Sequence, residues 1–485
     1  MRLSAYSQKS AADAPTGLTG NPAHDLARSF NVRVIIFLSL HIPLAMAMEL
    51  SPWVSTLHAV LATLYGLRAA LLGRPSQVVY AVAYIGAAEV LWRMSQAHLF
   101  WEYAKYGLIL IIFVAIVVEL RHGGEARRLR HASPLLLLLA LVPGAVMVIL
   151  ELGLGSARDA LSFNLSAYAA TGMLALYFWG RPINRDTTVR LLLAIMAPIV
   201  AITFLAVYFT LTDLDSLDFV GASNWVTSGN YGPNQVANMM GFGALAVVML
   251  FTLLPRARGA RGFVLLMTLA MLGQGLLTFS RGGIYSFVLA LAVFGLHLMN
   301  TPRARGRLLL IFGLFGVILV AGIYPLLDDF TGGSLSERFS DTDTTGRLEA
   351  AQVDLRAFSE NLFVGVGVGQ SNEYHITYLG HSLAAHTEYT RLLAEHGLFG
   401  VLALLVLIWM LVNRYAANSP GFGRAMSAAL AVWSASIMFH SAMRLAAIPV
   451  GLALALVLWR LRGRGEGEQA AAARAEPAHI EFGGR

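Results

Sequence analysis

Runs of apolar residues alternate with short polar segments along almost the whole of this 485-residue chain. A helix needs roughly 20 apolar residues to cross a bilayer core about 30 Å thick. Runs of about that length predict transmembrane helices at 32–50, 53–72, 78–92, 101–119, 133–150, 160–179, 189–211, 234–254, 262–278, 282–299, 307–325, 397–412, 424–442 and 446–459. We therefore expect an all-α polytopic bundle with about 12–14 transmembrane helices.

The polar segments divide the chain into five parts. We expect a disordered leader over 1–31, transmembrane helices over 32–325, one large and mostly helical loop over 326–396, further helices over 397–462 and a disordered tail over 463–485. The leader is rich in Ser, Ala, Gly, Asn and Pro, and the tail is rich in Gly, Glu, Ala and Arg. Such compositions are typical of segments that bury too little apolar surface to fold.

Basic residues gather in the short connections on one side of the predicted bundle. If the leader is cytoplasmic, the positive-inside rule is obeyed by the connections that hold Arg68, Arg74, Arg121, Arg127, Arg128, Arg130, Arg181, Arg185, Arg190, Arg256, Arg258, Arg261, Arg303, Arg305, Arg307, Arg414, Arg424, Arg460, Arg462 and Arg464. The acidic connection 212–233 and the long loop 326–396 then fall outside.

Composition excludes several classes of protein. The net charge of +7 is spread over short connections rather than one aromatic-rich patch, so it indicates membrane topology and not a nucleic-acid site. A mean hydropathy of +0.64 argues against a soluble protein. The absence of Cys rules out a disulfide framework, a thiolate zinc site and a cysteine nucleophile.

The long loop has the pattern of a small folded unit. It predicts a helix over 346–358, a turn-rich stretch over 361–372 and a second helix from about 383 that runs toward the membrane. The glycines at 365, 367 and 369 do not form the GxGxxG nucleotide motif, so they predict a turn.

The second helix carries two kinds of residue. At helical spacing, His386, Leu393 and Gly397 share a face that we expect to look inward. Glu388, Arg391 and Glu395 follow one another at spacings of three and four, which predicts a solvated ladder of ion pairs. An inward histidine is either a catalytic group or a core histidine with a hydrogen-bond partner.

The sequence HTEYTRLLAEHGLFG (386–400) resembles the signature of the O-antigen ligase superfamily of bacterial membrane glycosyltransferases, in which His, a small polar residue and nine further residues precede Gly-x-x-Gly. Thr387 stands where these ligases usually have Asn, Ser or Gln. Three further matches occur in the family's order, GNYGPNQVAN (229–238), TFSRGGI (278–284) and TTGRLEAAQ (344–352) with ENLFVGVGVGQ (360–370).

The resemblance implies a reaction and a location. Members of the family transfer a glycan from undecaprenyl diphosphate to an acceptor on the periplasmic side of the inner membrane, without a metal, a nucleotide or another cofactor. The partners implied are the lipid-linked glycan donor, a glycan or lipid A-core acceptor and the bilayer, with no nucleic acid. An en bloc ligase and a polysaccharide polymerase of the same superfamily both remain open.

This chemistry needs positive charge for the departing diphosphate. Arg side chains bind phosphate oxygens with two parallel hydrogen bonds and stay charged. The topology and the family match predict diphosphate binding by Arg281 and Arg347, and with them by Arg391 and Arg444. Arg356 is expected to be a charge on the surface of its helix.

The reaction also needs a base for the acceptor hydroxyl. A histidine of ordinary pKa can accept a proton near neutral pH, so His386 is the expected general base and Glu388 the alternative. A single displacement would invert the anomeric centre. Asn234 and Gln235 are expected either to bind sugar or phosphate or to cap the helix that follows Pro233.

A multi-helix transporter is the alternative from another class. It would use the ionisable residues inside the predicted spans, which are His41, His58, Glu89, Glu119 and His297. The charge density on the outer side and the long folded loop favour the enzyme. His381, His396 and His440 are expected to be structural or interfacial.

Overall fold

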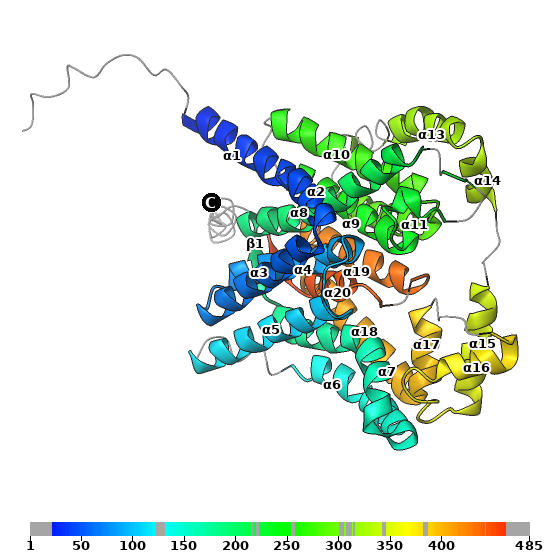
Figure 1. Ribbon diagram of the computed structural model, residues 1–485. Coiled ribbons are helices and arrows are strands. Elements are labelled where there is room, and N and C mark those ends of the chain that lie inside the picture. The colour runs from blue at the N-terminus through cyan, green and yellow to red at the C-terminus, as the bar shows by residue number, and fades with distance from the viewer. Residues whose placement is uncertain are drawn as a thin grey trace, which may run out of the picture.

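The chain is described by a computed structural model over residues 22–461, with gaps at 123–130, 215–216, 220–222, 254–257, 300–304, 307–312, 314–315, 342–345, 382–386 and 442. Nearly all regular structure in this part of the chain is helical, which confirms the predicted all-α bundle. Figure 1 shows the helices packed side by side, with the last ones threaded between the earlier ones.

The first part of the chain forms α1 (Pro22–Ser39), α2 (His41–Leu50), α3 (Pro52–Leu71), α4 (Pro75–Met94), α5 (Tyr103–Arg121), α6 (Ser133–Leu139), α7 (Val142–Phe178), β1 (Pro182–Asn184) and α8 (Arg185–Thr212). The middle forms a 3-10 turn (Val226–Ser228), α9 (Pro233–Leu253), α10 (Arg258–Leu277), α11 (Arg281–Leu298), a π-helical segment (Ile318–Ile323), α13 (Tyr324–Phe330) and α14 (Ser334–Ser340). The last part forms α15 (Arg347–Glu360), α16 (Ser371–Leu379), α17 (Glu388–His396), α18 (Leu398–Ala417), α19 (Phe422–Met438), α20 (Ala447–Ala455) and β2 (Leu458–Arg460).

The helices follow the predicted apolar runs but differ from them in several places. Helix α1 begins at Pro22, so residues 22–31 of the expected disordered leader are helical. Helix α7 joins two predicted runs, and only Gly153, with φ 75° and ψ 155°, leaves the helical conformation between them. Helix α17 begins at Glu388, five residues after the predicted start at 383. The run 307–325 and both termini lie partly outside the described residues.

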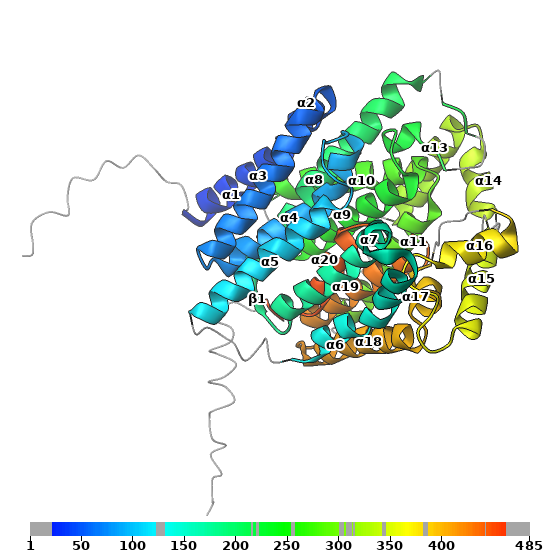
Figure 2. The same cartoon turned by 60° about the horizontal axis from the view of Figure 1, so that its bottom comes forward.

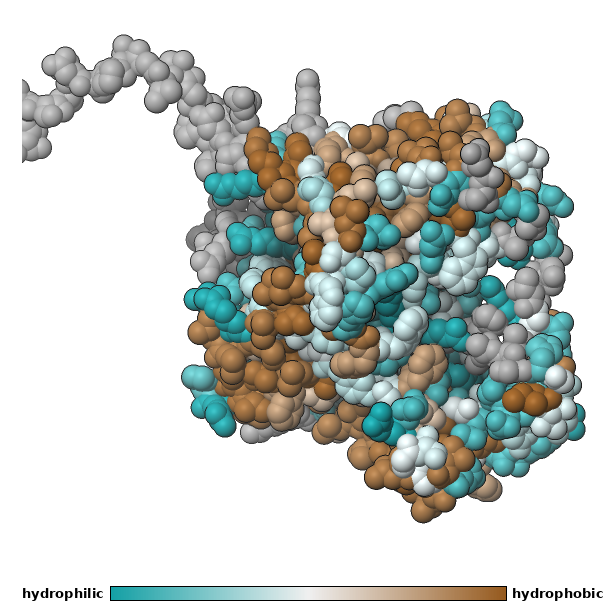
Figure 3. All heavy atoms as spheres, in the orientation of Figure 1, coloured by the Kyte–Doolittle hydropathy of each residue, from teal (hydrophilic) through white to brown (hydrophobic). Residues whose placement is uncertain are grey.

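Nine helices of the described chain are long and apolar enough to cross a membrane. Their outer faces keep large apolar side chains exposed, as α3 does with Leu57, Leu61 and Leu64. Figure 3 shows such side chains over α3 and α5, whereas hydrophilic side chains predominate over α15 and α16. Exposed apolar stripes of this extent suit contact with lipid rather than water.

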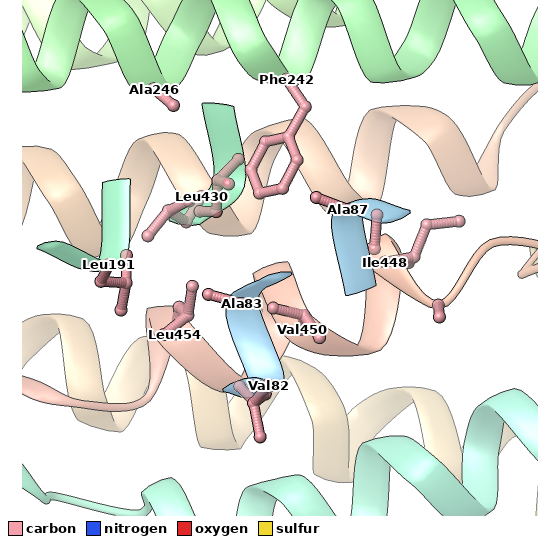
Figure 4. Close-up of a cluster of buried hydrophobic side chains, with 14 of the residues drawn as sticks. Val82, Ala83, Ala87, Leu191, Phe242, Ala246, Leu430, Ile448, Val450 and Leu454 are labelled. Carbon is pink, nitrogen blue, oxygen red and sulfur yellow. The ribbon is translucent and has the colours of Figure 1, made fainter. Parts of the chain in front are cut away.

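The core lies where α4, α8, α9, α19 and α20 meet. Figure 4 shows Phe242 of α9, Leu430 of α19 and Val450 of α20 packed around small residues of α4. Helices α4, α8 and α20 are buried around most of their circumference, which explains why their sequences are apolar on every face.

The bundle has two chemically different ends. At one end β1 pairs in parallel with β2, with Asn184 opposite Arg460. This pairing joins two connections that the charge pattern predicts on the cytoplasmic side. At the other end, α14 lies beside the start of α11, and α15, α16 and α17 pack on one another (Figures 1 and 2).

Close packing of α9 on α11 depends on glycine. A Cβ placed on Gly283 would lie 2.4 Å from the carbonyl carbon of Ala237. We expect Gly283→Ala to lower the free energy of unfolding by about 1–3 kcal/mol, because backbone atoms cannot yield as side chains can. Gly262→Ala is the control, since a Cβ there meets nothing within 4 Å. Equal thermal stability of the two variants in detergent would contradict this packing.

Candidate functional site

Helices α15, α16 and α17 form a small unit with its own buried contact. Nε2 of His375 lies 3.0 Å from Oδ1 of Asp354, and the hydroxyl of Thr390 donates to Oδ2 of the same carboxylate at 2.8 Å. Asp354 and His375 are both buried. One carboxylate therefore ties the three helices together.

The glycine-rich stretch forms the turn that the sequence predicts. The N–H groups of Val366 and Gly367 donate to the carbonyls of Ala394 and Glu395 at 2.9 and 3.2 Å. These are carbonyls in the last turn of α17, which have no partner within the helix. Gly365 has φ +78°, and a Cβ there would lie 2.4 Å from the carbonyl carbon of Glu395.

The Gly-x-x-Gly pair closes the corner between α17 and α18. Gly397 has φ +57°, and a Cβ there would lie 2.4 Å from the carbonyl oxygen of Leu362. At Gly400 a Cβ would lie 2.1 Å from the carbonyl oxygen of Leu392. Both glycines are required by close approach of backbone, so this part of the signature has a structural role.

The charged face of α17 is buried, so the prediction of a solvated ladder is wrong. Glu388, Arg391 and Glu395 are 0%, 9% and 3% exposed. The error has a physical reason: spacing shows which residues share a face, but the partners that cover this face come from distant segments. Arg356 on α15 is instead 57% exposed and pairs with Glu360 at 2.9 Å, as expected of a surface charge.

Glu388 accepts three hydrogen bonds from three parts of the chain. They come from the hydroxyl of Tyr168 on α7 at 2.6 Å, from the guanidinium of Arg391, and from the backbone N–H of Met443 at 2.9 Å. Burial by itself raises the pKa of Glu388, but Arg391 and the other donors outweigh it and lower the pKa. Glu388 is therefore a buried carboxylate anion that holds its neighbours in place.

Arg391 is neutralised within the chain. It pairs with Glu388, lies 3.7 Å from Oε2 of Glu395 and donates to Oδ1 of Asn164 on α7. Burial lowers the pKa of Arg391, and the two carboxylates raise it above its ordinary value by a larger amount. Arg391 was predicted to bind phosphate, but its guanidinium is occupied by the carboxylates of Glu388 and Glu395.

Glu395 and His396 carry shifted pKa values at the end of α17. Burial raises the pKa of Glu395 to about 7, although the nearby Arg391 opposes the shift. Burial and the charge of Arg391 lower the pKa of His396 to about 4, and its Nδ1 has no hydrogen-bond partner among the described residues. At neutral pH this histidine is uncharged.

Two buried carboxylates hold the connection between α19 and α20. The N–H of Met443 donates to Glu388, and the N–H of Ala446 donates to Oε2 of Glu89 on α4 at 2.6 Å. Arg444 lies between these two anchors and is partly buried. Burial lowers its pKa, and the positive charge on α17 adds to this effect. The backbone on both sides of Arg444 is therefore held by hydrogen bonds to buried carboxylates.

A second buried ion pair supports the same connection. Arg93 pairs with Glu89 at 2.8 Å and donates to the carbonyl of Trp101 at 2.8 Å, with its guanidinium 4.2 Å from the centre of the Trp101 ring. Its Nη1 reaches Oε1 of Gln235 at 3.4 Å, and that oxygen also accepts from the hydroxyl of Tyr231 at 3.1 Å. Gln235 thus binds neighbouring side chains.

At the start of α11, Arg281 and Arg338 each donate hydrogen bonds to the segment that carries the other residue. Arg281 donates to the backbone carbonyls of Arg338, at 3.3 Å, and Asp341. Arg338 donates to the carbonyl of Phe279 and to Oδ2 of Asp341, both at 3.3 Å. Phe279 is fully buried with φ 57°, a strained conformation for a residue with a bulky side chain. A reciprocal clamp therefore positions Arg281.

Arg347 begins α15 and faces the same cluster. It makes no hydrogen bond or ion pair with the residues that the structure describes, and its Nε is buried. Burial and the nearby positive charges of Arg281 and Arg338 lower its pKa. A half-buried guanidinium beside two others is unfavourable unless an anion joins them, so this cluster can bind an anion.

The other predicted site residues fall in different places. Asn234 does not cap α9: its Oδ1 accepts a hydrogen bond from the hydroxyl of Ser280 at 2.6 Å, next to Arg281. His386 lies outside the described residues, and Thr387, the residue before α17, has an extended backbone. His440 packs against α11, with Nε2 3.1 Å from the hydroxyl of Ser286.

The predicted residues therefore form two groups. The first group is Arg281 and Arg347, which lie near Arg338. The second is Arg391, Glu388 and Arg444: Arg391 pairs with Glu388, and its charge lowers the pKa of Arg444. Arg338, Arg93 and Tyr168 were not predicted from the sequence. A Glu four residues before Arg93 and an Asp three residues after Arg338 are the signals that could have identified the first two.

The residues that suggested a transporter have partners within the bundle. His41 and His58 both bind the hydroxyl of Tyr84, at 3.0 and 2.9 Å. Glu119 pairs with Arg181 at 2.8 Å, and Glu89 belongs to the pair described above. Among the described residues, no group of three or more His, Asp or Glu is placed to hold a metal ion.

Comparison with known proteins bears on this end of the bundle. A family model described as O-Antigen ligase matches residues 264–405, which include Arg281, Arg338, Arg347, Glu388 and the Gly-x-x-Gly corner. A search of curated proteins gives no match.

The raised pKa of Glu395 predicts a pH-dependent contribution to stability. The unfolded carboxyl has a pKa of 4.5 and the folded one about 7, so the folded state holds a proton that the unfolded chain releases. The stability from this group is present below pH 4.5 and is lost as the pH rises to about 7. We expect Glu395→Gln, which mimics the protonated form, to gain thermal stability relative to wild type across that window. A constant difference would contradict the shift.

The clamp around Arg281 predicts a coupling between Arg338 and Asp341. Arg338→Gln removes the hydrogen bonds to the buried carbonyl of Phe279 and to the carboxylate of Asp341, so we expect a loss of about 1–3 kcal/mol in unfolding free energy. In a double-mutant cycle with Asp341→Asn, the two losses should not add. Arg356→Gln, which changes an exposed arginine, is the control and should change stability little. Additive losses would show that the pair does not act as a unit.

Proposed function

We propose that this chain, which matches the O-Antigen ligase family model over residues 264–405, transfers a glycan en bloc from an undecaprenyl-diphosphate donor to an acceptor hydroxyl. The family match indicates a membrane glycosyltransferase of the ligase or polymerase type. The donor, the acceptor and the mechanism are our proposal.

The observation that carries the proposal is the arrangement around Arg347. Its guanidinium has no carboxylate or carbonyl partner among the described residues, although Arg281 and Arg338 lie close enough to lower its pKa. Clustered positive charge is a cost to the fold that a bound diphosphate would offset. The fork of Arg347 then binds phosphate oxygens, and the clamped Arg281 supplies a second positive charge.

In the transfer step, one bond to the anomeric carbon forms as another breaks. The acceptor oxygen attacks the anomeric carbon of the glycan as the bond from that carbon to the phosphate oxygen breaks, and the electron pair leaves with the diphosphate. Arg281 and Arg347 stabilise the negative charge that develops on the leaving oxygen, which is where fixed cations accelerate a reaction most. A single displacement inverts the anomeric centre.

We assign the acceptor's proton to His386. In the sequence this residue stands two positions before Glu388, whose buried network anchors the N-terminus of α17. Glu388, the alternative base, is fully buried and its oxygens already accept hydrogen bonds from three residues. In our proposal Glu388 and Arg391 position the site, and His386 acts on the hydroxyl.

Arg444, Asn234 and Gln235 complete the proposed site. Arg444 provides a third cation on the connection that Glu388 and Glu89 hold. Asn234 binds Ser280 beside Arg281, and Gln235 binds Arg93, so these two amides support the cations and offer remaining hydrogen-bond capacity to a sugar.

The proposed site faces the periplasm of a bacterial inner membrane. The support is the charge pattern: connections rich in arginine gather at the β1–β2 end, whereas the long loop and the acidic connection belong to the other end. A donor attached to a membrane lipid would reach this end from the bilayer.

Transfer by the purified protein in liposomes tests the proposal. With a labelled undecaprenyl-diphosphate glycan as donor, we expect Arg347→Gln, Arg281→Gln and His386→Ala to lower kcat/KM by about 100-fold or more. Arg356→Gln is the matched control and should retain the wild-type rate. Each variant is compared at equal thermal stability, so that loss of fold is not read as loss of chemistry.

The choice of acceptor separates the two members of the superfamily. Lipid A-core and a second lipid-linked repeat unit are offered in parallel reactions. Consumption of the first identifies a ligase, and elongation of the second identifies a polymerase. Rates within twofold of wild type in both Arg347→Gln and His386→Ala would overturn the proposed roles.

A further inference from the structure

A pocket lies at the opposite end of the bundle from the proposed transfer site. It has a volume of about 510 Å³, which is within the range of about 300–1,000 Å³ typical of small-molecule sites. Its walls come from the start of α4, the end of α5, β1 with the first turn of α8, and Arg460 at the end of β2. Four separate chain segments therefore meet around it.

The walls of the pocket are held by backbone pairing. β1 and β2 are in parallel register, which sets Arg460 opposite Asn184. The N–H of Leu458 donates to the carbonyl of Arg181 at 2.9 Å, and the side chain of Asn184 caps α8 by accepting from the N–H of Thr187 at 2.9 Å. The side chains that line the pocket thus stand on a fixed frame.

Arg181 is oriented so that part of its guanidinium remains available. Its Nε donates to the carbonyl of Tyr177 at 3.0 Å, its Nη2 pairs with Glu119 at 2.8 Å, and its plane lies 3.7 Å from the centre of the Tyr177 ring. Nη1 makes no hydrogen bond to a described residue. Arg460 is exposed, lines the pocket and makes no side-chain hydrogen bond or ion pair in the described chain.

The donors in the pocket match a phosphate group. Glu119 neutralises one arginine, which leaves the positive charge of Arg460 unbalanced. The hydroxyl of Ser76 at the start of α4 also lines the pocket. Two guanidinium groups and a hydroxyl that line one pocket form a set of donors that can bind phosphate oxygens.

The surroundings favour a phosphate that belongs to a lipid. Leu71 and Leu72, immediately before the pocket residue Gly73, are 65% and 50% exposed. The charge pattern places this end at the cytoplasmic surface of the membrane, where anionic lipid headgroups are concentrated. We propose that the pocket binds the headgroup phosphate of an anionic phospholipid, with its acyl chains over the exposed leucines.

Binding of defined lipids to the delipidated full-length protein tests this proposal. In detergent, we expect phosphatidylglycerol to bind more tightly than phosphatidylcholine by native mass spectrometry and to raise the thermal midpoint. Arg460→Gln should weaken phosphatidylglycerol binding about tenfold or more, and Arg460→Lys less, because a lysine keeps the charge but loses the fork. Arg460 lies outside the buried core, so these variants should fold.

Arg190→Gln is the matched control, because Arg190 is an exposed arginine of α8 that does not line the pocket. It should bind the lipid as wild type does. Equal affinity for the two lipids, or equal losses in Arg460→Gln and Arg190→Gln, would overturn the proposal. Inorganic phosphate that displaces the lipid at the lipid's own concentration would assign the pocket to a soluble phosphate instead.

Discussion

Buried carboxylates that accept backbone N–H groups hold the connection between α19 and α20 in place. Glu388 and Glu89 come from helices far apart in the sequence, and each binds one N–H of the short connection between α19 and α20. Hydrogen bonds to a charged acceptor are stronger than neutral ones, and a buried carboxylate without donors would be costly. The N–H groups of the connection therefore stabilise the two buried carboxylates, and the carboxylates in turn hold the connection in place.

The other features of this end follow from that constraint. Arg391 and Arg93 neutralise the two carboxylates, and so they are buried within the fold. Arg281 donates to the backbone carbonyls of Arg338 and Asp341, which orient its guanidinium. Arg347 has no partner in the described chain. Arg391 and Arg93 thus stabilise the bundle, whereas Arg347 is the cation that an anion could join.

The sequence predicted the helices well because membrane thickness sets their length and apolar composition marks each one. It also predicted the glycine turn at 365–369 and the surface position of Arg356, since both depend on local pattern. It failed for the charged face of α17, whose partners Tyr168 and Met443 lie 220 and 55 residues from Glu388. Arg338 was missed for the same reason, because its partner at Phe279 is 59 residues away.

The anchoring role of Glu388 can be measured directly by amide hydrogen exchange across the α19–α20 connection. The account predicts slow exchange at Met443 in wild type, faster exchange there in Glu388→Ala, and unchanged protection at Ala446, which Glu89 holds. Glu360→Ala, on the exposed surface of α15, should leave both amides protected. Unaltered protection of Met443 in Glu388→Ala would contradict the claim that this carboxylate holds the connection between α19 and α20 in place.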